Sequence, residues 1–295
     1  MFNKVSLLIV LFLAVPSSSY AQTTSAKEKI SQRYTEQNST TQHQVALDIL
    51  AASKVWITNF NKGNKKAVIE AYAPTAVMCA MPFGVKQGRK DIEDFWVPFI
   101  ESGATNLVYT DVSIEVVNDS TAFLSANWSM NVGRGVIYHE KWEKINGKWS
   151  YTYDNFEVLE QYDTPLVNTT DPIASHTVLE EIIRASMQWT NGFNAGKGDI
   201  CGNGYIENAT MNAVPFASII GKKEIQAFWT KLIADGAKNL IYNNPKFEVL
   251  TPNSAVLSAD WSMNIGKGKI YQEKWEKKDG KWLLTYDEFE VLKQY

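Results

Sequence analysis

Two pairs of acidic residues are the candidate chemical groups of this chain. Glu140 and Asp154 lie on either side of Asn146-Gly147, a dipeptide typical of the tight turn of a β-hairpin. Glu273 and Asp287 repeat the same spacing further along the chain. Carboxyls that share one face of a sheet among aromatic side chains have raised pKa values, and one of them can then act as a general acid or base. We therefore predict these four residues as catalytic groups.

The hairpin turn decides whether the two carboxyls of a pair meet. A three-residue loop at Asn146-Gly147 would make Glu140 and Asp154 diagonal neighbours on one face of the sheet. A two-residue loop would separate them. Alternatively, Glu140 pairs with Lys141 or Lys144 at the surface of the sheet and Asp154 caps a loop, since carboxylates on sheet surfaces are common.

Aromatic and sulfur-containing side chains supply the candidate walls of a binding cavity. The chain has 10 Trp, and each buried indole removes a large apolar area from water. Packing in the core is the alternative explanation for most of them. The predicted ligand-binding residues are Trp56, Met78, Trp128, Met130, Tyr138, Trp142, Trp189, Met211, Trp261, Met263, Tyr271 and Trp275.

Other kinds of site lack their motifs. The three histidines, His43, His139 and His176, do not form an H-E-x-x-H zinc motif, and the chain has no G-x-S-x-G nucleophile elbow. Its glycine-rich segments lack the remaining positions of a dinucleotide or phosphate-binding loop. We therefore predict neither a metal nor a cofactor. Cys79 and Cys201 occupy non-equivalent positions, which favours two free thiols over a disulfide.

The net charge limits the classes of binding partner, and the N-terminal segment indicates where the protein is located. The net charge of −3 and the scattered basic residues argue against nucleic acid or an anionic membrane surface as a partner. An apolar run at residues 5–15 follows Lys4 and leads to Ser19-Tyr20-Ala21, a pattern typical of a signal peptide over residues 1–21. The run is too short to span a bilayer. We expect export to the periplasm or beyond the cell, and a flexible polar leader at residues 22–42.

The chain then repeats itself at an offset of 133 positions. Residues 43–162 align without a gap on residues 176–295, and roughly half of the aligned positions are identical. Each copy is long enough to be a domain, and residues 163–175, with two prolines, read as a linker. Two similar domains in one chain favour intramolecular pairing, and further homo-oligomerisation is compatible with it.

Each copy is predicted to be an α+β domain. Apolar residues at three- and four-residue spacing indicate a long first helix, and alternating stretches after the third helix indicate four long antiparallel strands. About three N-terminal helices would pack on a strongly curved sheet and leave a cone-shaped cavity. The predicted elements of the first copy are helices at 45–60, 65–72 and 90–102 and strands at 76–80, 107–117, 122–132, 136–144 and 149–159.

This order of elements resembles the nuclear transport factor 2-like superfamily, in particular its SnoaL-like and ketosteroid isomerase-like branches. The motifs that carry the resemblance are Trp56-x3-Phe60-Asn61-x-Gly63, Tyr72-x3-Ala76-Val77-Met78, Gly88-Arg89-Lys90-x-Ile92-x2-Phe95-Trp96 and Trp142-Glu143-Lys144-x2-Gly147-Lys148-Trp149. The resemblance covers nearly all of both copies. It implies two tandem cone-shaped domains that pair through their sheets.

The resemblance also allows a test for isomerase chemistry. The isomerases place a Tyr on the first helix and an Asp on the first strand, with a protonated acid on a later strand. Trp56 and Trp189 stand at the Tyr position, and Ala80 and Ala213 at the Asp position. Glu140 and Glu273 fall near the position of the protonated acid. Because alanine has no proton acceptor, neither copy is expected to isomerise ketosteroids by that mechanism.

Three functions from different classes follow from these observations. In the first, each domain binds a small, largely apolar molecule in an aromatic-lined cone. In the second, the protein is a small-molecule lyase, isomerase or hydrolase that uses Glu140 with Asp154, and Glu273 with Asp287, as acid and base. In the third, the domains form an assembly module, an intramolecular pseudo-dimer. Carboxyls that face an enclosed cavity would favour the first two, and carboxyls that face bulk water would exclude the second.

Overall fold

The computed structural model describes residues 40–167 and 169–295. The predicted signal peptide, and the predicted leader up to residue 39, lie outside the described residues. Within those two ranges, no helix is both long enough and apolar enough to cross a bilayer.

The structure contains two successive sets of elements, which we call the first half (residues 41–161) and the second half (residues 174–294). The first half comprises α2 (Thr41–Asn61), α3 (Lys65–Glu70), β1 (Tyr72–Met81), β2 (Gly84–Gln87), α4 (Gly88–Glu101), β3 (Val108–Asn118), β4 (Thr121–Met130), β5 (Gly133–Ile145) and β6 (Lys148–Gln161). The second half comprises α5 (Ala174–Asn194), α6 (Gly198–Asn203), β7 (Tyr205–Val214), β8 (Ala217–Ile220), α7 (Lys222–Ala234), β9 (Ile241–Thr251), β10 (Ser254–Met263), β11 (Gly266–Lys278) and β12 (Lys281–Gln294).

The α+β class predicted from the sequence is confirmed, with four differences in detail. Helix α2 begins at Thr41, two residues before the predicted start of the first domain. The short strand β2 was not predicted, and β1 runs parallel to β6, so the sheet is not antiparallel throughout. Residues 133–135, which lie between the predicted strands 122–132 and 136–144, are the beginning of β5.

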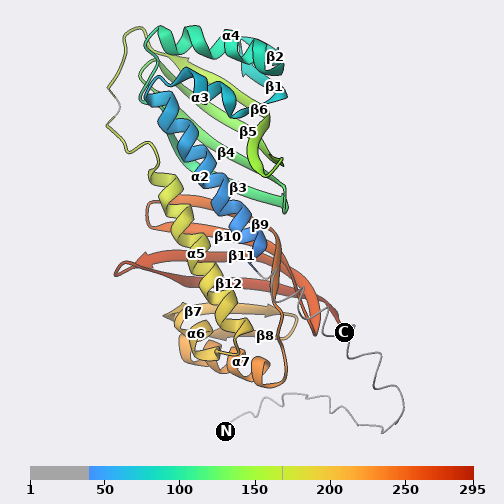
Figure 1. The fold of residues 1–295 in the computed structure, drawn as a ribbon. Coiled ribbons are helices and arrows are strands. Elements are labelled where there is room, and N and C mark those ends of the chain that lie inside the picture. The colour runs from blue at the N-terminus through green and yellow to red at the C-terminus, as the bar shows by residue number, and fades with distance from the viewer. Residues whose placement is uncertain (1–39, 168) are drawn as a thin grey trace, which may run out of the picture.

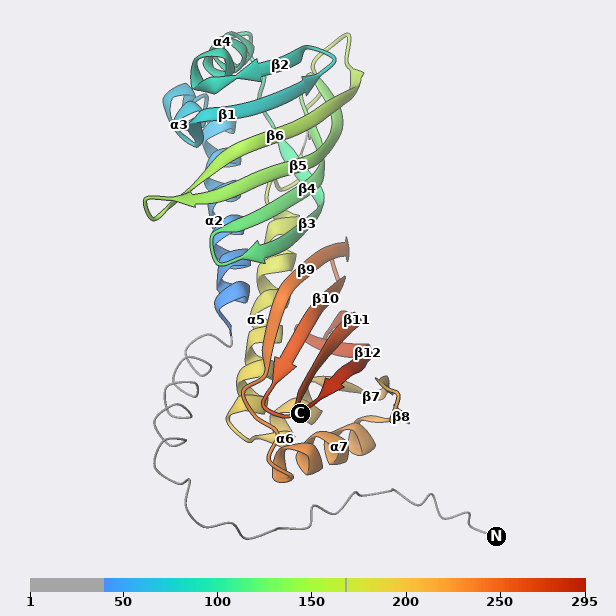
Figure 2. The ribbon, with the colours of Figure 1, turned by 90° about the vertical axis from the view of Figure 1, so that its right-hand side faces the viewer.

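One curved sheet of twelve strands runs through both halves. The strand order is β2-β1-β6-β5-β4-β3-β9-β10-β11-β12-β7-β8, so the two halves join where β3 pairs antiparallel with β9. In this junction Ile114 lies opposite Phe247, and both are fully buried. Helices α2 and α5 run side by side along one face of the sheet, while α4 and α7 lie at its two ends (Figures 1 and 2). The helices thus cover the concave side of each half.

The long first helix of each half presents an apolar stripe to the sheet. In α2, Ile49, Trp56 and Phe60 are buried, whereas Val55 points outward and is exposed. This spacing places the buried residues on one side of the helix, where the sheet removes their apolar surface from water. The equivalent Trp189 and Phe193 of α5 are buried in the same way, so each helix forms one wall of the space enclosed by its own half.

Two reciprocal hydrogen bonds hold the helices α2 and α5 together. His43 Nε2 lies 2.9 Å from Ser186 Oγ, and His176 Nε2 lies 2.9 Å from Ser53 Oγ. Burial lowers the pKa of His43 to about 4 and that of His176 to about 3. Both rings are therefore neutral near pH 7. The two halves pair within one chain through equivalent residues on each side.

Candidate functional site: carboxyl pairs in two apolar cavities

Glu140 of β5 lies directly opposite Asp154 of β6. The turn between these strands has two residues, because Ile145 pairs with Lys148, so the three-residue loop considered from the sequence is not formed. A shift of register between Lys141 and Trp142 nevertheless moves the pairing by one residue and brings the carboxyls together. A β-bulge of this kind places one extra residue on one strand and re-aims the side chains beyond it. Glu140 and Asp154 are therefore direct neighbours, not diagonal ones.

The second half repeats this arrangement in full. Glu273 of β11 lies opposite Asp287 of β12, and the register again shifts next to the pair, between Lys274 and Trp275. All four carboxyl residues are buried, with exposed fractions between 1% for Glu140 and 5% for Asp154. The alternative of a surface ion pair for Glu140 is wrong, because Lys141 instead contacts Glu143, 2.9 Å away.

Each carboxyl of the first half accepts a hydrogen bond from a buried tyrosine. Tyr109 donates its hydroxyl to Glu140 Oε1 at 2.8 Å, and the indole of Trp142 donates to Oε2 of the same residue at 3.3 Å. Tyr72 donates to Asp154 Oδ2 at 2.7 Å, and Trp96 Nε1 donates in turn to the Tyr72 hydroxyl at 3.1 Å. These donors come from four different elements, so the tertiary fold assembles the network.

The same network recurs in the second half. Tyr242 and Trp275 donate to Glu273 at 2.7 and 3.0 Å. Tyr205 donates to Asp287 Oδ2 at 2.6 Å, and Trp229 Nε1 donates to the Tyr205 hydroxyl at 3.2 Å. These residues sit 133 positions after their counterparts in the first half.

Burial is the main influence on the protonation of these carboxyls. It raises the pKa of Glu140 and Glu273 to about 8, and the neighbouring aspartate of each pair pushes the pKa of the glutamate in the same direction. Burial also raises the pKa of Asp154 and Asp287 to about 7, against the hydrogen bonds from Tyr72 and Tyr205. Each pair therefore binds and releases protons near neutral pH, because an apolar site disfavours the charged form of both carboxyls.

The tyrosines that contact the carboxyls remain hydrogen-bond donors. Burial raises the pKa of Tyr72 and Tyr109 well above its ordinary value, and the adjacent carboxyls add to the effect. The same holds for Tyr205 and Tyr242. Because the raised pKa keeps these phenols protonated at neutral pH, they act as hydrogen-bond donors to the carboxyls.

An apolar cavity lies over each carboxyl pair. The first has a volume of about 50 Å³ and is closed off largely by aromatic rings. Asp154 is the carboxyl residue that lines it, and Phe83, which also lines it, is 46% exposed. The residues around it are Trp56, Phe83, Phe95, Trp96, Phe99, Leu107, Tyr109, Trp128, Met130, Ile137, Asp154, Phe156 and Val158.

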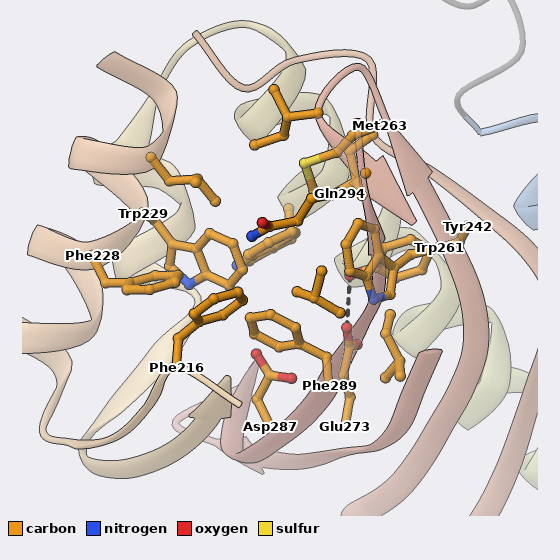
Figure 3. A pocket seen from close by; sticks show the side chains of 17 residues that line it. Phe216, Phe228, Trp229, Tyr242, Trp261, Met263, Glu273, Asp287, Phe289 and Gln294 are labelled. Atoms are coloured by element: carbon orange, nitrogen blue, oxygen red, sulfur yellow. Dashed lines mark hydrogen bonds between the residues drawn. The ribbon is translucent and has the colours of Figure 1, made fainter. Parts of the chain in front are cut away.

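The cavity of the second half is larger, with a volume of about 110 Å³. Both Glu273 and Asp287 line it, together with Phe216, which is exposed. Figure 3 shows the two carboxyls at one end of the cavity, Trp229 and Trp261 on facing sides, and Met263 at the other end. A molecule in this cavity would have the carboxyls at one end, the amide of Gln294 as a further polar group, and apolar walls elsewhere.

The structure brings half of the predicted ligand-binding residues to the cavities. The residues that line a cavity are Trp56, Trp128, Met130, Trp189, Trp261 and Met263. Trp142 and Trp275 lie behind the glutamates as hydrogen-bond donors. Met78 and Met211 are fully buried, where their sulfur atoms lie 3.9 Å from the hydroxyls of Tyr72 and Tyr205.

The placement of Tyr138 and Tyr271 in a cavity was wrong. Tyr138 is 44% exposed, and its hydroxyl donates to Glu157 at 2.5 Å on the outer side of the sheet. Tyr271 is 50% exposed and contacts Glu290. The reason is a register shift at each tyrosine, which turns the side chain to the opposite face from the one that strict alternation predicts.

The sequence interpretation missed the tyrosine donors. Tyr72 and Tyr205 begin the first strand of each half, and Tyr109 and Tyr242 lie near the start of β3 and β9. A signal was present, since all four are retained at the 133-residue offset. Nothing in the local pattern, however, tells a tyrosine that reaches a carboxyl from one that packs in the core.

Two substituted positions from the isomerase comparison can also be placed. Trp56 lines the first cavity, whereas Ala80 is fully buried and does not line it. The carboxyls of this protein therefore reach the cavity from β6, β11 and β12, and not from the first strand.

Comparison with known proteins gives a likeness in fold alone. No protein-family model matches the chain, and no curated protein matches its sequence. Among solved structures, a protein of Novosphingobium aromaticivorans provisionally named a scytalone dehydratase is 12% identical, with 41% of this chain and 89% of that chain aligned and a TM-score of 0.37. An NTF-2 like protein of unknown function from Shewanella oneidensis is 19% identical (38% and 97% aligned, TM-score 0.33). An NTF2-like protein with a cystatin-like fold from Novosphingobium aromaticivorans is 15% identical (38% and 80% aligned, TM-score 0.33).

Two of these neighbours are described as NTF2-like. Each aligns with about 40% of this chain, the length of one half. Identities this low carry no information about ligand or reaction.

Proposed function

We propose that each half binds a small, largely apolar molecule in its cavity and holds a polar group of that molecule with Asp154 or Asp287. The observation that carries the proposal is a buried carboxyl at one end of a cavity whose other walls are mostly aromatic and aliphatic, with Gln294 as the further polar residue in the second half. Apolar walls supply affinity, and a single well-placed polar group supplies orientation, which is the usual design of a small-molecule site.

The charges around the cavities favour an uncharged ligand. Among the described residues that line either cavity, none is Arg, Lys or His, so an anionic ligand would find no partner of opposite charge. Asp154 and Asp287 each accept one tyrosine hydrogen bond on Oδ2. The remaining carboxyl oxygen can accept a hydrogen bond from a ligand hydroxyl or amide, or can donate to a carbonyl when it is protonated.

Native mass spectrometry of the full chain tests this proposal. We expect a small molecule to leave the protein on unfolding, and a variant with filled cavities, Val158→Trp with Val291→Trp, to retain much less of it. The matched control is Val117→Trp with Leu250→Trp, which adds the same side chain at exposed positions. Equal amounts of bound molecule in filled and control variants, or none in the wild type and no uptake of small aromatic alcohols, would contradict the proposal.

Acid–base catalysis is a second candidate, and one observation favours it. In the second half both Glu273 and Asp287 line the cavity, and burial places the pKa of both close to neutral. Such a pair could supply an acid and a base to a lyase, isomerase or hydrolase reaction. Glu273→Gln separates the two candidates: simple binding predicts nearly unchanged affinity, whereas catalysis predicts lost turnover in a folded protein that still binds.

A role in assembly alone is less well supported than binding. The β3–β9 junction joins the halves, but each half still encloses a cavity of its own.

We also propose that the protein is exported, and this rests only on the signal peptide pattern of residues 1–21. N-terminal sequencing of the mature chain should begin at Gln22, and a mature chain that retains Lys4 would contradict export by this signal.

A further inference from the structure

The two cavities differ in size and in polar lining although the halves share one fold. The volume is about 110 Å³ in the second half and about 50 Å³ in the first. Glu273 lines the second cavity together with Asp287, whereas the first is lined by Asp154 without Glu140. A duplicated binding site with identical roles would not need either difference.

One substitution at the cavity wall accounts for part of the extra volume. Phe99 lines the first cavity, and its ring lies 5.9 Å from Trp96 and 6.5 Å from Phe60. The equivalent residue in the second half is Leu232, which lines the second cavity. Because a leucine side chain is shorter than a phenyl ring, the space occupied by the Phe99 ring is left partly open.

A second substitution changes the surroundings of the tryptophan on the long first helix of each half, Trp56 in α2 and Trp189 in α5. Trp189 Nε1 donates to the carbonyl of Cys201 in α6 at 3.1 Å, whereas the indole nitrogen of Trp56 is buried without a partner among the described residues. A Cβ on Gly204 would lie 2.7 Å from Trp189 Cδ1, closer than such contacts allow. The first half has Ala71 at that position. The absence of a side chain at Gly204 therefore lets the Trp189 ring lie close to α6. Helix α6 itself does not line the cavity.

A third substitution lies beneath the carboxyls. Tyr151 is buried in the first half, with its ring 3.8 Å from Trp142 and 4.8 Å from Tyr72. The second half has Leu284 in its place. Glu273 therefore has one aromatic ring fewer packed near it than Glu140 has. Glu273 is also the glutamate that lines its cavity.

We propose that the two cavities select ligands of different size: the second accepts a neutral ring-containing molecule that bears a hydroxyl group, and the first accepts only smaller molecules, with Phe99 and Leu232 as the residues that set this difference. This inference rests on the proposed binding function. The chain would then have two different binding sites, and only the second would offer two carboxyls to one ligand.

Fluorine NMR with 4-fluorophenol as the probe tests the inference on the full mature chain. We expect one equivalent to bind to the wild type, with shifts of the Trp261 indole N–H resonance and not of the Trp128 resonance. Leu232→Phe should weaken this binding by about tenfold or more, since filling the space forces the walls apart. Phe99→Leu should add a second equivalent of bound probe. The double variant Leu232→Phe with Phe99→Leu should bind one equivalent, which now shifts the Trp128 indole N–H resonance instead of that of Trp261.

The controls keep failure of folding apart from failure of the inference. Leu232→Met keeps the side-chain volume and should bind 4-fluorophenol as the wild type does. Fluorobenzene lacks the hydroxyl and should bind the second cavity more weakly than 4-fluorophenol does. Two equal sites in the wild type, or one site unaffected by Leu232→Phe and Phe99→Leu, would overturn the size inference and leave the binding function standing. Folded variants that bind neither probe in any form would overturn both.

Discussion

The ring of Tyr109 lies 6.0 Å from the ring of His176, which belongs to the other half of the molecule. Tyr242 stands in the same relation to His43, at 5.6 Å. Since Tyr109 donates to Glu140, and Tyr242 to Glu273, each carboxyl pair is supported on one side by a histidine from the opposite half. The interface that pairs the halves is therefore also the wall behind the two carboxyl sites.

Removing a tyrosine donor should destabilise the fold by a measurable amount. Tyr109→Phe deletes the hydroxyl that donates to Glu140, and we expect a loss of about 1 to 3 kcal/mol in the free energy of unfolding, because a buried acceptor is left without its partner. Urea denaturation at pH 7 measures it. Tyr138→Phe is the matched control, since this hydroxyl is on the exposed side and its loss should cost less than about 0.5 kcal/mol. Equal losses in the two variants would contradict the buried network.

The carboxyl pairs should make stability fall as the pH rises towards 8. Glu140 and Glu273 ionise near 4.5 in the unfolded chain and near 8 in the folded protein. Between these values the folded state holds protons that the unfolded state has released, so their stabilising effect is complete at low pH and is lost as the pH rises through the folded pKa.

Replacing the glutamates by neutral amides should remove this dependence. We expect Glu140→Gln with Glu273→Gln to flatten the slope of unfolding free energy against pH by about 1 kcal/mol per pH unit for each residue replaced, between pH 5 and 7. Glu115→Gln is exposed on β3 and serves as the control. An unchanged slope in the double variant would show that these glutamates are ionised in the fold.

The interface histidines should act in the opposite direction at lower pH. His43 and His176 have pKa values of about 4 and about 3 in the fold, against an ordinary value of 6.5. Below 6.5 the unfolded chain takes up protons that the folded protein cannot, so the stability present above 6.5 is lost as the pH falls towards the folded pKa values. At pH 5 the loss should reach about 2 kcal/mol for each histidine.

The difference between variant and wild type isolates this effect from that of the carboxyls. His43→Gln with His176→Gln removes the titration while leaving an amide near Ser186 and Ser53, and should be less sensitive to acid than the wild type between pH 6.5 and 5. Thermal unfolding across that range measures it. His139→Gln is the control, because His139 is exposed on β5. Identical acid sensitivity in the double variant and the wild type would contradict a buried, neutral interface.

Gly135 is expected to tolerate no side chain. A Cβ there would lie 1.8 Å from the carbonyl oxygen of Glu157 and 2.7 Å from Trp128 Cζ2, so strand β6 and the indole would both have to move. We expect Gly135→Ala to cost more than about 3 kcal/mol of unfolding free energy and to disturb the first cavity, because Trp128 is one of its walls. Denaturant unfolding and the Trp128 indole N–H resonance report the two effects.

The neighbouring Arg134→Ala provides the control, because its ion pair with Glu160 is exposed and should contribute less than about 0.5 kcal/mol. If Gly135→Ala proved as mild as Arg134→Ala, the close approach of the Trp128 ring to β5 would be wrong.

The sequence by itself determined the repeat, the order of the elements and the identity of the four carboxyls. Helix periodicity predicted the long first helix, and Asn146-Gly147 predicted the hairpin that carries Glu140 and Asp154. These features follow from local chemistry: side-chain spacing selects helix or strand, and turn residues select the loop. The element boundaries were consequently within a few residues of those observed.

Only the tertiary structure decided how the carboxyls meet and what surrounds them. The bulge beside Trp142 sets the Glu140–Asp154 register, and a separate register shift between Ile137 and His139 turns Tyr138 outward. Such bulges depend on how neighbouring strands must twist to close the sheet. The donors Tyr72 and Tyr109 reach the carboxyls from other elements. The two cavity volumes are small spaces between closely packed surfaces, so exchanges such as Phe99 for Leu232 and Tyr151 for Leu284 can change them while leaving the pattern of the sequence unchanged.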